Sequence, residues 1–474
     1  MINISANSSS RECFFDDYLI DTQKTTAEFR VHQPTQRDIA LVHDAPWEGD
    51  GCDYHNILYD NGIYRMYYLG WHMISSDMKE HTTSGIRVCY AESRDGLSWT
   101  KPSLGICEWE GSWDNNIILD KSTADFDNFM VFRDDNPTVP DSERYKGVAK
   151  IDGTLRMFTS PDGVRFTKGE IITDKGFFDS LNVVFWDGYA GIYRGYIRGF
   201  HNIKDTDWNS GIRDIRYIWS ADGKRWSDPK PLNFGESEDF PLYTNCVSPY
   251  IRAPQLYIGF PTRYVERREW NNSFEQLCGK EKRLERMKLH PRYGLAVTDC
   301  VFMVSRDGIN FKRYDEAFMR PGPENGINWV YGDCYPARGL IQTPSPIEGE
   351  GPELSLYCFD NHWMGVPARL WRYAIRPDGF VSLNAGNTEK MITTKPFSFT
   401  GSKMRVNFST SARGYMYFTL KSSTGETLES GEHFGDSDNR LITFNNDRLS
   451  DFAGKEVVMT VRLLDADLYS ICFS

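Results

Sequence analysis

The sequence predicts an all-β protein, built as a five-bladed β-propeller followed by a C-terminal antiparallel β-sandwich. Two observations predict this fold class. A short motif of the form Ser-x-Asp-Gly-x-x-aromatic recurs between residues 93 and 383, and short segments of alternating polar and apolar residues flank its copies. After residue 384 the motif stops, although the alternation typical of strands continues to the end of the chain.

The repeated motif defines the blades. Its copies read "SRDGLSW" at 93–99, "SPDGVRF" at 160–166, "SADGKRW" at 220–226 and "SRDGINF" at 305–311, with a degenerate "RPDGFVSL" at 376–383. Asp-Gly favours a type I′ hairpin turn, in which both central residues take a positive φ. Five copies therefore predict five four-stranded blades. The alternative is an irregular β-sandwich whose hairpins share Asp-Gly by coincidence.

The predicted domain boundary follows from where the motif ends. Residues 1–383 are assigned to the propeller, which would carry the catalytic site, and residues 384–474 to the sandwich. Segments such as 62–70, 86–93 and 255–261 alternate as strands do. One charged stretch at 272–289 is typical of a short helix within a loop.

Composition excludes several classes of partner. The formal net charge of −12 disfavours nucleic acids and anionic membranes, both of which select for a basic surface. The start of the chain lacks the pattern of a signal peptide, so we expect a cytoplasmic protein with reduced cysteines. No Cys-x-x-Cys pair or other metal-ligand spacing occurs, and neither a metal nor a cofactor is expected. A homo-oligomer is compatible with the sequence.

Acidic residues that precede the first strand of a blade are the candidate catalytic groups, because the innermost strands of a propeller converge on its axis. One such acid is found in each unit: Asp53, Asp134, Asp179, Glu238 and Asp333. Asp135 follows Asp134 directly, and successive strand residues face opposite ways, so only Asp134 is expected to point inward. Any single Asp beside a turn can equally be a turn cap.

Convergent carboxylates suit the hydrolysis of glycosides. One carboxylate attacks the sugar or activates water, while a second, with a raised pKa, protonates the leaving oxygen. Arginines recur in the same segments, and they either pair with these acids or bind an anionic group such as a uronate or a phosphate. The candidate substrate-binding residues are His55, Trp71, Arg133, Arg198, Tyr243, Arg263 and Arg338, and the further arginines Arg213 and Arg252 share the pattern.

At the level of motifs the chain resembles the five-bladed glycosidases of glycoside hydrolase families 32, 43 and 68, and most of all a broad bacterial family-32-like group. Asp53 stands eleven residues before Tyr64, which matches the spacing of the first family-32 motif. Arg133-Asp134 resembles the Arg-Asp-Pro motif, with the proline displaced to position 137. "FDSLN" at 178–182 stands where the family has Glu-Cys. The resemblance implies that Asp53 is the nucleophile or base and that Asp134 stabilises the transition state.

Three functions follow as hypotheses. The first is a glycoside hydrolase that removes a terminal sugar, with furanosides among the candidates, from an oligosaccharide or glycoside. The second is a glycoside phosphorylase or transglycosylase, and the third is a non-catalytic carbohydrate-binding propeller. The recurrence of acids in comparable positions favours an enzyme, because a binding module does not require them.

Overall fold

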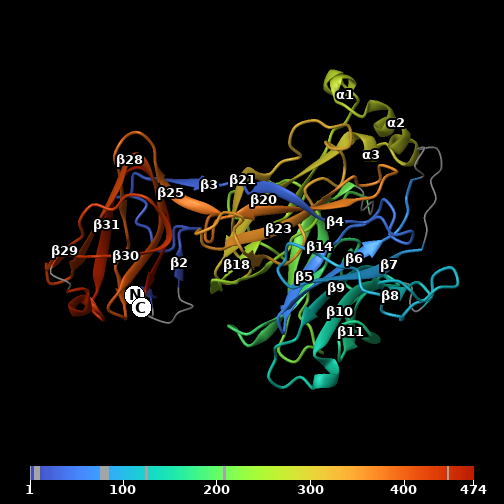
Figure 1. Cartoon of the computed structure of the whole chain (residues 1–474), viewed down its shortest axis with the longest axis horizontal. Helices are drawn as coiled ribbons and strands as arrows, with labels where there is room; N and C mark the ends of the chain where they lie inside the picture. The colour runs from blue at the N-terminus through green and yellow to red at the C-terminus, as the bar shows by residue number, and fades with distance from the viewer. Residues whose placement is uncertain (1, 5–10, 75–84, 123–125, 206–209, 446–447) are drawn as a thin grey trace.

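The computed structural model contains a five-bladed β-propeller and a separate β-sheet domain, which confirms the predicted fold class. It describes residues 2–4, 11–74, 85–122, 126–205, 210–445 and 448–474. In Figure 1 the sheet domain lies at one side, with both chain ends on it, and the propeller lies at the other. Each has its own apolar core.

Five sheets form the propeller, and the chain visits them in order. Blade 1 contains β5 (Asn56–Asp60), β6 (Ile63–Gly70), β7 (Arg87–Ser93) and β8 (Ile117–Asp120). Blade 2 contains β9 (Asp127–Arg133), β10 (Tyr145–Ile151), β11 (Thr154–Ser160) and β12 (Thr167–Thr173). Blade 3 contains β13 (Val183–Asp187), β14 (Ile192–His201), β15 (Ile212–Ser220) and β16 (Lys230–Pro231).

The last two blades depart from this regular pattern. Blade 4 contains β17 (Ser248–Tyr250), β18 (Ala253–Gly259), β19 (Thr262–Glu266), β20 (Ala296–Ser305) and β21 (Phe311–Met319). Blade 5 contains β22 (Ile341–Thr343), β23 (Glu353–Asp360) and β24 (Arg369–Ile375), and its outer strand is β4 (Thr35–Val42). Because β4 comes from the start of the chain, its pairing with β24 closes the ring of blades.

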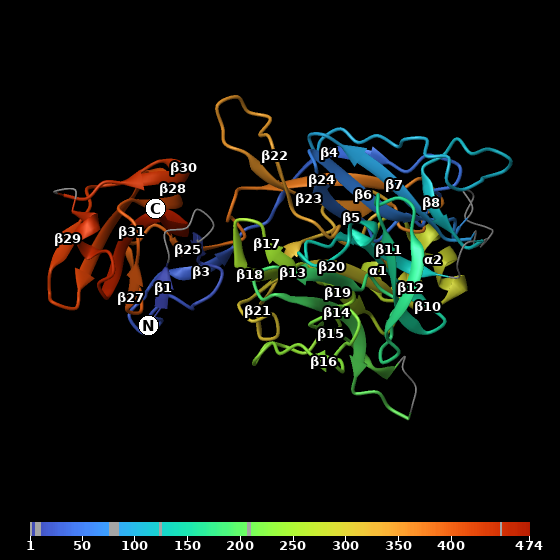
Figure 2. The ribbon, with the colours of Figure 1, turned by 90° about the horizontal axis from the view of Figure 1, so that it is seen from below.

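Helices occur as an insertion in blade 4. Between β19 and β20 the chain forms α1 (Asn272–Gln276), α2 (Lys280–Leu289) and α3 (Arg292–Leu295). The predicted helix at 272–289 is thus two helices, because Gly279 takes a positive φ of 73° between them. Figure 2 shows the ribbon from below. Among the described residues, no helix is long and apolar enough to cross a membrane.

The C-terminal domain is a ten-stranded sheet wrapped around an apolar core. Its strands are β1 (Ile2–Ile4), β2 (Arg11–Cys13), β3 (Glu28–Val31), β25 (Val381–Ala385), β26 (Lys390–Thr393), β27 (Phe397–Phe399), β28 (Met404–Ser422), β29 (Thr427–Glu429), β30 (Asp436–Ile442) and β31 (Val457–Phe473). All pairs are antiparallel except β1 with β27. Three strands come from the first 31 residues, and Phe14 and Ile20 lie in the same core.

The repeated motif builds a turn between the third and fourth strands of blades 1 to 4, but not the type I′ turn that Asp-Gly predicts. In each copy the glycine alone has a positive φ, as Gly163 does at 80°. The preceding Asp162 instead accepts backbone hydrogen bonds from Val164 (3.0 Å) and Arg165 (2.8 Å), and its carboxylate also bonds Ser160 Oγ (3.0 Å). The side chain supplies the turn, so the backbone of Asp need not become left-handed.

These turns also join neighbouring blades. Tyr67 of β6 donates its hydroxyl hydrogen to Gly163 O in blade 2 (2.9 Å), and Tyr196 of β14 donates to Gly308 O in blade 4 (2.9 Å). Tyr357 of β23 donates in the same way to Gly96 O in blade 1. The copies at 93–99, 160–166 and 305–311 thus form both a turn and a contact with the blade before them.

The degenerate fifth copy links the two domains. Asp378 is fully buried and accepts hydrogen bonds from Tyr250 Oη (2.7 Å) of blade 4 and Ser470 Oγ (2.7 Å) of β31. Arg252 Nε lies 2.9 Å from its carboxylate and Arg11 Nε 3.4 Å. Burial raises the pKa of Asp378, but the two guanidinium groups outweigh it and hold the pKa below 3.8.

We predict that Asp378→Asn destabilises the protein by about 3 kcal/mol, because it leaves two largely buried guanidinium groups without their anion. Urea unfolding at pH 7 measures this, and Asp451→Asn, at an exposed ion pair with Arg448, is the control. Since the folded-state pKa of Asp378 is depressed, the difference should shrink as the pH falls below 3.8. Equal stability of the two variants at pH 7 would contradict the role of Asp378.

Candidate active site

A cavity of about 300 Å³ lies where the innermost strands of the blades begin. Each blade contributes one residue to its lining from just before, or at the start of, its first strand: Asp53, Asp127, Asp179, Tyr243 and Tyr335. The convergence expected of a propeller is therefore present at this end of the ring. Three of the five positions carry a carboxylic acid.

The backbone bends sharply beside these positions. Non-glycine residues with a positive φ stand at the entrance to four of the five innermost strands: Tyr54 (51°), Asn128 (57°), Cys246 (47°) and Cys334 (55°). Such conformations are unfavourable for L-residues and persist only where the surrounding structure imposes them. At Tyr54 and Asn128 the side chain of the preceding residue, Asp53 or Asp127, lines the cavity.

Asp53 is the most enclosed of the three acids. Its side chain lines the cavity, its residue is only 3% exposed, and Oδ1 has no hydrogen-bond partner among the described residues. Leu69 N donates to its carbonyl oxygen (3.0 Å), which fixes the segment against β6. Burial, together with the charges of Asp127 and Asp179, raises the pKa of Asp53 well above 3.8. The environment of Asp53 therefore favours its protonated form, compared with a carboxyl group in water.

Asp127 begins β9 and faces the same cavity. Its register partner on β10 is Lys150, whose Nζ lies 3.9 Å from Oδ2. Burial and the neighbouring Asp179 raise the pKa of Asp127 to about 6, against the lowering effect of Lys150 and Lys121. Asp127 is thus an acid that changes its charge close to neutral pH.

Asp179 is more open, with a side chain 54% exposed, and forms an ion pair with Arg198 (Nη1 to Oδ2, 3.4 Å). The segment that carries it is anchored on both sides. Ser180 Oγ donates to Tyr243 O in the next blade (2.6 Å), and Asn182 Nδ2 donates to Phe178 O (2.7 Å). Asp179 is therefore a carboxylate on a fixed segment, with a cation beside it.

Aromatic side chains form the opposite wall. Tyr54 and Tyr243 share a hydroxyl–hydroxyl hydrogen bond of 3.0 Å, and Tyr335 packs against both rings. Trp71 and Trp363 meet edge to face, with ring centroids 5.7 Å apart. Flat faces of this kind suit the apolar faces of a sugar ring.

The helical insertion holds part of this wall in place. Arg283 and Arg286 of α2 are both buried; Arg283 Nη2 donates to Trp329 O (2.7 Å), and Arg286 Nη2 donates to Tyr331 O (3.0 Å). These bonds fix the loop that carries Tyr331 and Tyr335 into the cavity. The helix α3 adds Arg292 and Tyr293 to the lining.

The sequence placed one catalytic candidate at the wrong end of a strand. Asp134 is buried, but it follows β9, while Asp127 begins it, so the two lie roughly 20 Å apart along the strand. Asp134 accepts from Tyr193 Oη (2.8 Å) and from Asn136 N (3.1 Å) instead of facing the cavity. Arg133 pairs there with Asp60 (3.1 Å) and Asp135 (3.2 Å).

The other two candidate acids also lie outside the cavity lining. Glu238 is exposed in the loop that precedes β17, and its carbonyl oxygen accepts from Arg313. Asp333 is buried behind the cavity wall, where Oδ2 accepts from Val330 N (2.8 Å). Burial raises the pKa of Asp333 to about 7. Its position makes it a cap for the loop that bears Tyr331.

Of the predicted substrate-binding residues, some line the cavity and others lie elsewhere. Trp71, Arg198 and Tyr243 line the cavity. His55 is buried and bonds His43 (2.9 Å), while Arg263 pairs with Asp299 (Nε to Oδ1, 2.8 Å). Arg338 is buried between blades 5 and 1, where its amide donates to His55 O (2.9 Å). The structure does not bring these three to the cavity.

Asp127 is a functional candidate that the sequence analysis left out, because in the sequence it resembles an acid in a turn. The run "NFMVF" after it is a strand, so Asp127 stands at the start of the first strand of its unit, where Asp53 and Asp179 shortly precede theirs. The sequence analysis instead placed the acid of this unit before "RYKGVAK" at 144–150, which overlaps the second strand. The pattern of an acid followed directly by an apolar strand would have identified Asp127 as a candidate.

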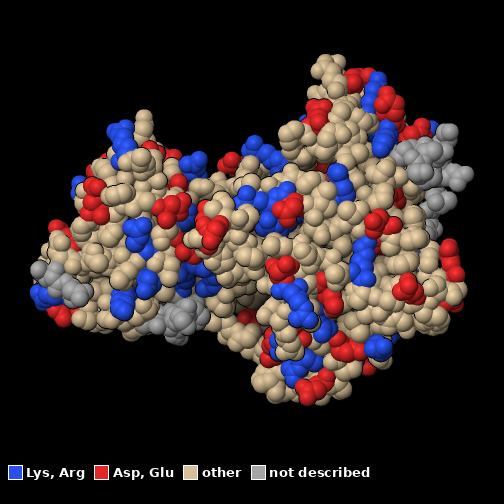
Figure 3. All heavy atoms as spheres, viewed as in Figure 1, with Lys and Arg blue, Asp and Glu red and all other residues tan. Residues whose placement is uncertain are grey.

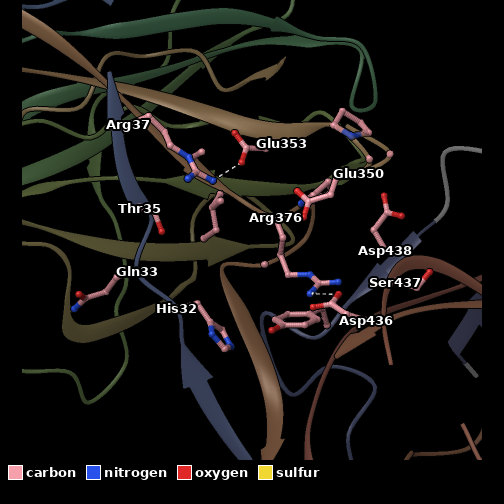
Figure 4. Close-up of a pocket in the computed structure, with 18 residues that line it drawn as sticks. His32, Gln33, Thr35, Arg37, Glu350, Glu353, Arg376, Asp436, Ser437 and Asp438 are labelled. Atoms are coloured by element: carbon pink, nitrogen blue, oxygen red, sulfur yellow. Dashed lines mark hydrogen bonds and ion pairs between the residues drawn. The ribbon is translucent and has the colours of Figure 1, made fainter. Parts of the chain in front are cut away.

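A larger cavity, of about 680 Å³, is a groove between blade 5 and the C-terminal sheet (Figure 4). Its charged side chains already pair with one another. Arg37 Nη2 lies 2.5 Å from Glu353, and Arg376 Nη1 lies 2.8 Å from Asp436. Glu350 accepts from Ser345 Oγ (2.9 Å). The groove therefore lacks the unpaired buried acid that distinguishes the smaller cavity.

On the side of the molecule that Figure 3 shows, the basic and acidic side chains of the described residues are interspersed. Among the residues that the structure describes, no group of three or more His, Cys, Asp or Glu side chains could hold a metal ion.

Comparison with known proteins finds likeness in shape alone. No family model matches the chain, and no curated protein matches its sequence. A thermostable family-43 glycoside hydrolase is 13% identical over 74% of this chain and 95% of its own, with a TM-score of 0.44. A family-62 α-L-arabinofuranosidase from Coprinopsis cinerea is 9% identical over 73% and 97%, with a TM-score of 0.44.

A fructofuranosidase from Schwanniomyces occidentalis, solved with fructosylnystose, matches a larger share of the chain. It is 11% identical over 94% of this chain and 99% of its own, with a TM-score of 0.38. At such low identities and TM-scores, function has to be inferred from the residues of the cavity.

We predict that Asp127 titrates near pH 6 and that Asp179→Asn lowers this value, because it removes a neighbouring negative charge that raises the pKa. Carbon-13 NMR of labelled aspartate carboxyls measures both, and the signal is assigned by its loss in Asp127→Asn. Asp135→Asn, at the far end of β9, is the control and should leave the value unchanged. An unchanged pKa in Asp179→Asn would contradict the coupling.

Proposed function

We propose that the protein is a glycoside hydrolase that cleaves a terminal sugar within the cavity of Asp53, Asp127 and Asp179. The observation that carries the proposal is the position of the three acids at the starts of three successive innermost strands, around one cavity. Glycoside hydrolysis needs one protonated and one ionised carboxyl group beside the same anomeric carbon.

The environments of the acids suggest how these roles divide. Asp53, buried and without a hydrogen-bond partner for Oδ1 among the described residues, supplies the proton to the leaving oxygen. Asp179, ion-paired with Arg198, is the carboxylate that attacks the sugar or activates water. The charge of Asp127 raises the pKa of Asp53, and the pKa of Asp127 is raised in turn by the charge of Asp179. The family-32 resemblance implies the opposite role for Asp53, so an experiment has to separate the two assignments.

The size of the cavity supports action at a chain end. A volume of about 300 Å³, closed on one side by Tyr243 and Tyr335, accommodates about one or two sugar rings rather than a long chain. A panel of furanosides and pyranosides tests whether that sugar is a furanoside. The proposed hydrolysis needs no cofactor, because the chain supplies one protonated and one ionised carboxyl group, and the attacking water replaces the proton that the leaving oxygen takes.

The first test is the loss of activity on substitution. We predict that Asp53→Asn, Asp127→Asn and Asp179→Asn each lower kcat/KM on a cleaved aryl glycoside by a factor on the order of 10²–10⁴. Asp134→Asn is the control, since it removes a buried acid from the far end of β9, outside the cavity. If Asp134→Asn loses activity while Asp127→Asn keeps it, the site is wrong.

The second test assigns the roles through the leaving group. A variant that lacks the general acid should cleave a dinitrophenyl glycoside nearly as fast as wild type but an alkyl glycoside far more slowly, because the better leaving group needs no proton. We predict this pattern for Asp53→Asn and a loss on both substrates for Asp179→Asn. The reverse pattern would exchange the two roles. The nitrophenyl panel should include furanosides and pyranosides.

A further inference from the structure

The arginines of the cavity outnumber the acids that neutralise them. Arg198 of β14, Arg213 of β15 and Arg292 of α3 all line it. Of these, only Arg198 has a carboxylate within 4 Å among the described residues, namely Asp179. Arg213 and Arg292 have none in that part of the chain. A guanidinium that is largely removed from water without an anion is costly unless a ligand provides one.

The arginines and the two most buried acids do not neutralise each other. The groups that shift the pKa of Asp53 are Asp127 and Asp179, and the cations that act on Asp127 are Lys150 and Lys121. Asp53 and Asp127 belong to blades 1 and 2, whereas the arginines belong to blade 3 and the helical insertion of blade 4. Asp53 and Asp127 therefore lie on other blades than the three arginines, whereas Asp179 of blade 3 pairs with Arg198.

Aromatic rings hold the arginines in position. The guanidinium of Arg213 lies 4.2 Å from the ring centroid of Tyr264 and 5.8 Å from that of Tyr243. Its Nε is buried and has no hydrogen-bond partner among the described residues. Arg292 stacks at 5.3 Å on Tyr293. Stacking leaves the planar edge of a guanidinium available, and this edge is what binds a carboxylate through two parallel hydrogen bonds.

We propose that Arg213 and Arg292 bind a carboxylate carried by the sugar, so that the substrate is a glycoside of a uronic acid. This assignment deepens the proposed function and rests on it. The sugar ring would lie against Tyr243, with its anomeric carbon toward the acids and its carboxylate toward the arginines. A neutral sugar would leave the two guanidinium groups without a counter-charge.

Calorimetric titration of the full chain tests the binding part without any turnover. The probes are the methyl glycosides of D-glucuronate and D-galacturonate, each compared with its neutral counterpart, methyl glucoside or methyl galactoside. We expect at least one uronide to bind roughly ten-fold or more tightly than its counterpart, with affinity falling as salt is added. Equal affinity for the acidic and neutral sugars would overturn the proposal.

Variants place the binding at the named arginines. Arg213→Gln and Arg292→Gln should each abolish most of the preference for the uronide, whereas Arg225→Gln, whose side chain is 92% exposed on the edge of blade 3, should keep it. If Arg213→Gln fails to fold, Arg213→Lys retains the charge but not the paired geometry and should lose part of the preference. Full preference in the Arg213 and Arg292 variants would overturn the assignment.

Inorganic phosphate is the remaining probe, because the same guanidinium groups could serve a phosphorolytic enzyme. Phosphate that binds more tightly than any uronide would overturn the proposal in favour of a phosphate site. A chain that binds a uronide through Arg213 but cleaves no glycoside supports the anion site while it counts against the hydrolase.

Discussion

The site depends on one geometric constraint: the five innermost strands of the propeller begin at the same end of the ring. Whatever residue precedes each strand is thereby brought to one place, and in this chain three of the five are aspartates. The constraint holds only while the ring is closed. The ring is closed by β4, a strand near the start of the chain, which pairs with β24 of blade 5. The Asp-Gly turns then tie neighbouring blades through tyrosine hydroxyls.

Burial raises the pKa values of two of these aspartates. Three carboxyl groups in one enclosed space cannot all be ionised without large cost, so protons are retained by the most enclosed members. Asp53 and Asp127 have raised pKa values for this reason. Asp179 lies further out with its arginine. Arg213 and Arg292 have no carboxylate within 4 Å among the described residues, and this is the basis for proposing a ligand with its own negative charge.

Much of the fold could be predicted from the sequence because its signal is local. Each turn copy is seven residues long, and its serine, aspartate and glycine all act within it. The pairing of β1, β2 and β3 with the C-terminal sheet could not be predicted in this way, because the partners are hundreds of residues apart. The boundary expected at residues 383 and 384 falls inside β25, which belongs to that sheet.

The site could be predicted only in part, because the fold alone brings some of its residues together. Asp53 and Asp179 stand shortly before strands whose start is clear, and the structure brings both to the cavity. Asp134 and Asp135 follow Arg133 in a charged segment, but they come after β9 instead of preceding a first strand. Asp127 has no distinctive motif around it in the sequence, yet it is the acid at the start of β9 that lines the cavity. Arg292 could not be foreseen, since only the folding of the helical insertion places it there.

A crystal structure of the Asp179→Asn variant with a bound glycoside tests the central claim most directly, because it decides between the two cavities. The account predicts a sugar ring against Tyr243, with a carboxyl oxygen of Asp53 or Asp127 at roughly 2.6–3.2 Å from an oxygen of the sugar. A sugar bound instead in the groove of Arg37 and Arg376, with the cavity of Asp53 empty, would contradict it.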